Sequence, residues 1–113
     1  MQMNKLSWVL IGAVLLSACA TKRVERSIEA YHEAAATVKP GDSREAVLSV
    51  LNPTQWRLPF DEKKQPEKYT RDGKLVEVHY FRARLIDDGK TTDDEFVPYT
   101  FVNDVLTEIG WRK

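Results

Sequence analysis

The sequence contains few of the residues from which disulfides and metal sites are built. One cysteine and two histidines among 113 residues exclude an internal disulfide and a Cys/His zinc site. The chain also has no excess of charge, because seventeen Lys and Arg balance seventeen Asp and Glu. We therefore expect no nucleic-acid partner, since such proteins gather their ligand with a basic field. With 42% hydrophobic and 30% charged residues, the chain suits one folded domain.

The longest apolar run lies near the start of the chain, from Leu6 to Leu16, after the single charge of Lys5. It is shorter than the about 20 residues that a membrane-spanning helix needs, and such a run after a positive charge is typical of a secretory signal. The following residues, Leu16-Ser17-Ala18-Cys19, resemble a bacterial lipobox. The resemblance implies that Cys19 is acylated and that signal peptidase cuts before it. The alternative is a buried free cysteine after an uncleaved anchor.

This interpretation divides the chain into a signal peptide (1–18), a lipidated tether (19–23) and a single domain (24–113). Two or three acyl chains hold a protein on a bilayer far more durably than one myristoyl chain, at about 0.8 kcal/mol per buried methylene. Ala20, and no Asp, follows the cysteine. In enterobacterial-type sorting this implies the periplasmic leaflet of the outer membrane. Acylation of Cys19 also leaves no thiol for catalysis.

Apolar periodicity predicts two helices in the first half of the domain. The first helix is indicated by apolar residues at steps of four and three, namely Val24, Ile28, Tyr31, Ala35 and Val38. Lys39-Pro40-Gly41 ends this helix. Asp42-Ser43 offers an N-cap for a second, short helix. Asn52-Pro53 ends it, because Asn tolerates a left-handed cap and Pro cannot continue a helix.

The residue pattern in the second half of the domain predicts three strands, at 75–86, 96–102 and 106–111. The apolar phase shifts beyond Tyr80, which indicates a bulge or a twist there. Residues 54–74 are irregular and polar and end in the tight turn Arg71-Asp72-Gly73-Lys74, and residues 87–94 form an acidic hairpin loop. Helices followed by strands predict an α+β fold, with two N-terminal helices packed on one face of a three-stranded antiparallel meander.

The residues of the second helix and of the C-terminal hairpin resemble a known family. Residues 38–47 followed by Leu51-Asn52-Pro53, and Phe101 with the Asn-Asp turn and Leu106 to Trp111, are similar to motifs of the BamE/SmpA/OmlA lipoproteins or an uncharacterised relative of them. The resemblance implies an outer-membrane lipoprotein with a role in envelope or outer-membrane-protein assembly. Asn52 stands where a Gly is usual, and the long acidic hairpin at 87–95 resembles the uncharacterised relatives of the family more than BamE itself.

Three groups of polar residues could carry chemistry, and each also has a structural interpretation. The acids of the 87–95 loop lack the alternating order of a Ca²⁺ loop, so we expect a solvated hairpin and no metal site. His79 could be a general base, but no Ser or Cys motif accompanies it, and Glu77 is an ordinary ion-pair partner. Arg82 and Arg84 could grip a phosphate or a partner carboxylate; cross-strand pairing with the acids at 93–95 is the favoured alternative.

The aromatic residues of the strands indicate an exposed apolar surface. Because Tyr80 and Phe81 are neighbours on a strand, they cannot both point at the helices. Exposed apolar patches mark interaction sites, so we expect a protein partner to bind one open sheet face, aided by the first helix. The candidate residues are Tyr80, Phe81, Arg82, Arg84, Tyr99 and Trp111. The alternative is that residues 54–74 fold over this face and seal it.

Together these patterns predict a lipid-anchored binding or scaffold protein of the bacterial envelope. We expect it to have no catalytic residues, cofactor, metal or small-molecule substrate, because no nucleophile, base and orienting residue can be assembled from the types present. Its partners would be the membrane, through the lipid, and an envelope protein. The competing hypothesis is a periplasmic inhibitor or stress sensor that grips a soluble protein with the same sheet, in a layout similar to β-lactamase-inhibitor folds.

Overall fold

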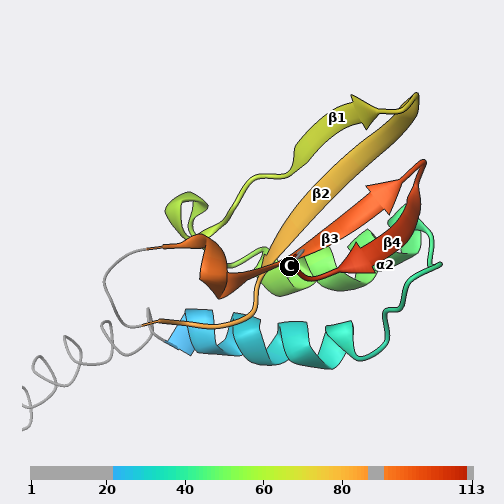
Figure 1. Cartoon of the computed structure of the whole chain (residues 1–113). Helices are drawn as coiled ribbons and strands as arrows, with labels where there is room; N and C mark the ends of the chain where they lie inside the picture. Colours follow the sequence, from blue (N-terminus) through green and yellow to red (C-terminus); the bar gives the residue numbers. More distant parts are fainter. Residues whose placement is uncertain (1–21, 87–90, 112–113) are drawn as a thin grey trace, which may run out of the picture.

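The computed structural model describes residues 22–86 and 91–111 (Figure 1). Within this part of the chain, the first helix covers residues 22–35, so Lys22 and Arg23 are helical although the sequence placed them in the tether. It buries Val24 and Tyr31 of the predicted stripe, together with Ser27, whereas Ile28 and Ala35 are half-buried. The helix ends at residue 35, before the predicted stop at Lys39-Pro40-Gly41, so Val38 lies outside it.

The second helix, α2 (Arg44–Leu51), begins as its sequence predicts and ends differently. Ser43 is its N-cap, and the side-chain oxygen accepts a hydrogen bond from the Ala46 N–H at 3.1 Å. At the other end Asn52 keeps right-handed dihedrals (φ −56°, ψ −43°) and no left-handed cap forms there. The chain tightens instead into the 3₁₀ helix η1 (Asn52–Gln55), which accommodates Pro53 in its first turn.

The sheet has four strands and not the predicted three. They are β1 (Glu67–Arg71), β2 (Lys74–Arg82), β3 (Phe96–Val102) and β4 (Val105–Ile109), antiparallel and in the order β1-β2-β3-β4. The additional strand, β1, lies inside the segment that the sequence describes as irregular. The short 3₁₀ helices η2 (Phe60–Glu62) and η3 (Asp93–Glu95) precede β1 and β3. The fold is therefore α+β, with two helices followed by a four-stranded antiparallel meander that the helices contact.

Two tight turns, both recognisable in the sequence, connect the outer strand pairs. Asp72 and Gly73 adopt positive φ angles of 53° and 75° between β1 and β2. Asn103 and Asp104 do the same between β3 and β4, at 47° and 67°. Consecutive left-handed residues match the twist of a two-residue hairpin, and Asn, Asp and Gly tolerate them best.

The register between β2 and β3 is continuous from Val76↔Val102 to Arg82↔Phe96, so no bulge occurs at Tyr80. The irregularity of the sheet lies elsewhere, between Thr100 and Phe101 where they face β4. The phase shift beyond Tyr80 has another cause: Glu77 and Arg82 are polar yet buried, so the polar positions of β2 do not mark its exposed face.

Side chains from one face of the sheet and from both helices form the core. The Tyr31 and Tyr99 hydroxyls lie 2.8 Å apart, and the Phe81 and Tyr99 rings meet edge to face at 5.3 Å. The buried cluster consists of Tyr31, Val47, Leu48, Leu51, Phe81, Tyr99, Phe101 and Leu106. Because Phe81 points into this cluster, its neighbour Tyr80 points to the opposite face, which we call the outer face.

Candidate functional site

The outer face of the sheet carries a shallow groove of about 290 Å³. Its walls come from alternate residues of all four strands and from the segment that follows β4, since side chains two apart share a face. The lining residues are Glu67, Tyr69, Val78, Tyr80, Pro98, Thr100, Glu108, Gly110 and Trp111. Tyr69 and Trp111 are 42% and 49% exposed, so the groove is open to a partner.

Two aromatic side chains form one wall of the groove, and polar contacts fix their orientation. The Tyr80 and Trp111 rings lie 5.7 Å apart at an interplanar angle of 31°. The Trp111 indole Nε1–H donates to the Phe96 carbonyl at 2.9 Å. The Tyr80 hydroxyl donates to Glu67 Oε1 at 3.1 Å, and the Lys64 ammonium lies 4.7 Å from the Tyr80 ring centroid.

The Tyr80 hydroxyl remains protonated throughout the physiological pH range. Burial, and then the hydrogen bond to the Glu67 carboxylate, raises the pKa of Tyr80 to about 12. The groove therefore presents an amphipathic surface, with aromatic rings at its centre and the Glu67 carboxylate at its rim. Such a surface suits a contact with another protein, because Tyr and Trp supply large contact area with few rotatable bonds.

Residues 54–74 do not close this face. Their last part adds β1 to the sheet and so extends the outer face. Trp56 and Phe60, the aromatic residues that could have covered the sheet, are exposed. Glu67 and Tyr69 of this segment line the groove from β1, and Lys64 contacts the Tyr80 ring beside it.

The structure divides the six predicted partner-binding residues into three groups. Tyr80 and Trp111 lie in the groove. Phe81 and Tyr99 are buried in the core, and Arg82 is buried in an ion pair, so these three leave the candidate surface. Arg84 is exposed beyond the end of β2 and does not line the groove. Tyr69 belongs to the surface but was not recognised, because its strand was not.

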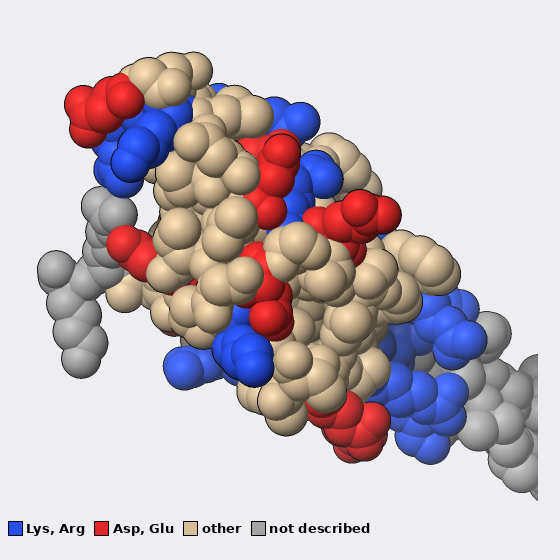
Figure 2. All heavy atoms as spheres, turned by 90° about the vertical axis from the view of Figure 1, so that its right-hand side faces the viewer, with Lys and Arg blue, Asp and Glu red and all other residues tan. Residues whose placement is uncertain are grey.

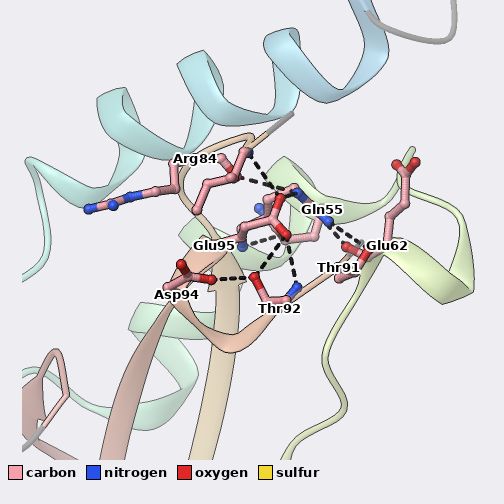
Figure 3. Close-up of polar contacts among 9 residues, drawn as sticks. Gln55, Glu62, Arg84, Thr91, Thr92, Asp94 and Glu95 are labelled. Atoms are coloured by element: carbon pink, nitrogen blue, oxygen red, sulfur yellow. Dashed lines mark hydrogen bonds and ion pairs between the residues drawn. The ribbon is translucent and has the colours of Figure 1, made fainter. Parts of the chain in front are cut away.

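Arg82 and Glu95 form a buried ion pair that organises the end of the sheet (Figure 3). Each residue is 1% exposed, and Arg82 Nη1 lies 2.7 Å from Glu95 Oε2. The guanidinium also donates to the Glu62 and Arg84 carbonyls and to Thr91 Oγ1, at 3.1, 3.3 and 3.3 Å. The predicted pairing with the acids at 93–95 is confirmed for Arg82, whose partner is Glu95, whereas Arg84 forms no ion pair within the described residues.

The Glu95 carboxylate is held in its charged form by its neighbours. Burial raises its pKa, but the Thr92 N–H, Arg82 and the Ile86 N–H outweigh burial and hold the pKa of Glu95 below its ordinary value. The Thr92 N–H donates to Oε1 at 2.9 Å, completing the capping box of η3. With both charged groups of the pair satisfied, this cluster joins the end of β2 to η3 and has a structural role.

Glu77 and His79 also point away from the outer face, towards the helices. Glu77 pairs with Arg44 and, at 3.1 Å, with Lys68, and these contacts outweigh burial and lower its pKa. Burial lowers the pKa of His79, which is therefore neutral at pH 7. Within the described residues, the buried Nε2 atom of His79 has no hydrogen-bond partner. No described Ser or Thr hydroxyl is hydrogen-bonded to this ring, so the geometry does not assemble a nucleophile and base.

Residues 22–86 and 91–111 contain no group of three or more His, Cys, Asp or Glu side chains that could hold a metal ion. Asp87 and Asp88 of the acidic loop lie outside the described residues, as does Cys19. In the part of the chain that is described, no helix has the length and hydrophobicity needed to cross a bilayer.

Comparison of the chain with models of known protein families, with curated proteins and with solved structures finds no match. The resemblance to BamE/SmpA/OmlA lipoproteins therefore stays a prediction from the motifs. The features that bear on function are the lipobox-like residues 16–19 and the outer face of the sheet.

Proposed function

We propose that this chain is a lipid-anchored binding protein of the bacterial outer membrane, which docks an envelope protein on the outer face of its sheet. The observation that carries the proposal is the open groove around Tyr80 and Trp111, in a chain whose residues 16–19 resemble a lipobox. The protein acts by binding and performs no covalent chemistry.

The small size of the groove suits a weak contact that a tether makes effective. A stable protein interface buries about 1,200–2,000 Å² in total, and a groove of about 290 Å³ accommodates one or two anchor side chains. An acyl anchor at Cys19 confines the domain to the membrane surface, which raises the effective concentration of any partner held there. The effective concentration therefore rises most for a membrane-resident partner, such as an outer-membrane-protein assembly factor.

The chemistry of the groove favours a partner that inserts an apolar or basic side chain. Tyr69, Tyr80 and Trp111 supply the aromatic surface, and the Glu67 carboxylate lies beside it. A Lys or Arg side chain of the partner can stack on these rings, as Lys64 of this chain already does on Tyr80.

Two experiments test the anchor and the contact separately. Labelling cells with radioactive palmitate should acylate the wild-type chain and leave the Cys19→Ala variant unlabelled. A photo-reactive phenylalanine analogue in place of Tyr69 should cross-link an integral outer-membrane protein or assembly factor in wild-type cells. The same analogue in place of Val50, which is exposed on α2, is the matched control.

The cross-linked protein and its dependence on the lipid discriminate between the two hypotheses. Loss of the cross-link in Cys19→Ala supports the scaffold, because the contact then depends on confinement. A soluble enzyme cross-linked equally well without the lipid would contradict the scaffold and support the inhibitor or sensor. Equal cross-linking from Tyr69 and Val50 would show that the outer face is not the docking surface.

A further inference from the structure

Four basic side chains surround a hollow at the start of the first helix. Lys22, Arg23, Arg26 and Arg57 line a space of about 410 Å³. Arg23, Arg26 and Arg57 also line an adjoining space of about 380 Å³, together with Trp56. We call Lys22, Arg23, Arg26, Arg57 and Trp56 the basic groove. In the view of Figure 2, one cluster of Lys and Arg side chains lies at the lower right of the molecule.

The cations of the basic groove are not neutralised within the described chain. The ion pairs among the described residues use the cations of Arg44, Lys64, Lys68 and Arg82, and none of them involves a residue of the basic groove. Glu25 and Glu29 lie on the same helix, but neither forms an ion pair with the groove residues. Four unpaired cations around one hollow repel each other, so the groove favours an anionic ligand from outside.

The aromatic residue of the groove points to an interface between water and lipid. Trp56 is 72% exposed, although an indole ring gains by leaving water. Tryptophan is enriched at the headgroup level of membranes, where its ring is buried and its N–H stays hydrated. Arginine beside it binds phosphate oxygens in a bidentate manner.

The position of the groove in the sequence fits the same surface. Lys22 follows Cys19 by three residues, and an extended chain spans at most about 3.6 Å per residue, so their Cα atoms lie within about 11 Å. An acyl chain on Cys19 would enter the bilayer from this point. The turns of the β1–β2 and β3–β4 hairpins lie at the other end of the molecule (Figure 1).

We propose that the basic groove binds the headgroups of anionic phospholipids in the membrane that holds the anchor. The bilayer phosphates supply the anionic partners that Lys22, Arg23, Arg26 and Arg57 lack within the described chain. Trp56 inserts among the headgroups. The proposal rests on the proposed anchor for its location. Its consequence is a fixed orientation, in which the two hairpin turns point away from the bilayer.

The test removes the anchor, so that only the groove can bind. The chain from residue 19 with Cys19→Ser retains the whole buried core, which runs from Val24 to Leu106. Its co-sedimentation with vesicles of phosphatidylcholine containing 30 mol% phosphatidylglycerol, roughly the anionic content needed for a measurable surface potential, is compared with pure phosphatidylcholine vesicles. Each basic residue near such a surface strengthens binding about fivefold. Arg23→Gln, Arg26→Gln and Arg57→Gln together should therefore weaken binding about a hundredfold.

The matched control removes three exposed cations elsewhere: Lys39→Gln, Arg71→Gln and Lys74→Gln. It changes the net charge equally and should weaken binding no more than about fivefold. Circular dichroism checks that both triple variants fold. In a Trp111→Phe background, Trp56 is the one tryptophan left after residue 18, and its emission should shift to the blue on anionic vesicles only.

Three results would overturn the proposal: equal binding to neutral vesicles, equal loss in both triple variants, or no shift of the Trp56 emission. The anchor is judged separately by the palmitate label. Vesicle binding without acylation of Cys19 would reject the anchor and keep the groove, and acylation without groove-dependent binding would reject the groove alone.

Discussion

The arginines of this protein occur in two contrasting settings. Arg82 is buried, and Glu95 and three oxygen acceptors satisfy its guanidinium. Arg23, Arg26 and Arg57 line an open hollow and have no ion-pair partner within the described chain. The first setting holds the fold together, and the second leaves charge available for a ligand. The same side chain is structural where its partners are internal and a candidate for binding where they are missing.

The largest effect should follow from breaking the internal pair. Arg82→Met leaves the Glu95 carboxylate buried without its cation, and loss of one partner of a buried pair costs about 3–5 kcal/mol. Urea unfolding followed by circular dichroism measures the loss. Arg84→Met is the control, because Arg84 is exposed and two residues away. Equal destabilisation by the two variants would contradict a special role for the pair.

A smaller loss should follow from removing the side chain that supports Arg82. The Gln55 Oε1 atom accepts the Arg82 backbone N–H at 2.9 Å, and its Nε2 donates to Thr54 Oγ1 at 3.0 Å. Gln55→Met leaves a buried N–H without an acceptor, which costs about 1–3 kcal/mol in the free energy of unfolding. The exposed Gln65→Met is the control. An unchanged urea midpoint in Gln55→Met would show that water or another group replaces the amide.

Acid should lower the free energy of unfolding in two steps, because three titratable side chains have different pKa values in the folded and unfolded chains. The pKa of His79 in the folded chain lies below its ordinary 6.5, and those of Glu77 and Glu95 lie below 4.5. The unfolded chain therefore binds more protons, so the free energy of unfolding should fall as the pH drops below 6.5 and fall again below 4.5. Urea midpoints between pH 7 and pH 3 measure both steps. His79→Phe should abolish the step below pH 6.5 and keep the step below pH 4.5. A first step that persists in His79→Phe would show that His79 does not cause it.

The smallest effect on stability should follow from substituting the exposed arginines of the basic groove. Arg23→Gln combined with Arg57→Gln removes two exposed cations that have no internal partner, so the urea midpoint should not move measurably. A rise in stability at low salt would indicate that repulsion within the groove is felt in the folded chain. A clear loss would contradict the contrast, because it would require an internal partner for these arginines.

The sequence predicted the parts of the fold that local chemistry determines. Ser43 caps α2, and the pairs Asp72-Gly73 and Asn103-Asp104 make the hairpin turns, because each depends on neighbouring residues alone. β1 was missed because all five of its residues are exposed, so it has no alternation of apolar and polar positions. Its pairing with β2 is decided by the turn and by cross-strand contacts, which a window of sequence does not contain.

The candidate site was predicted in part for the same reason. Strand alternation separates Tyr80 from Phe81 but does not say which of the two faces the helices. The choice is made by the core, where Phe81 packs on Tyr99, and by the buried polar residues Glu77 and Arg82. The basic groove was not predicted, because Arg57 and the cations of the first helix are far apart in the sequence and line one hollow only in the folded chain.

The free edge of β1 has a consequence for the proposed anchoring of many copies on one membrane. An unpaired strand edge is a template for another strand, and copies confined to two dimensions collide more often than copies in bulk water. Glu67, Lys68 and Arg71 place charges along this edge, and Lys68 is further held by its ion pair with Glu77. Charged edges resist strand addition, so this pattern would disfavour an intermolecular sheet between copies that the proposed anchor holds in one leaflet.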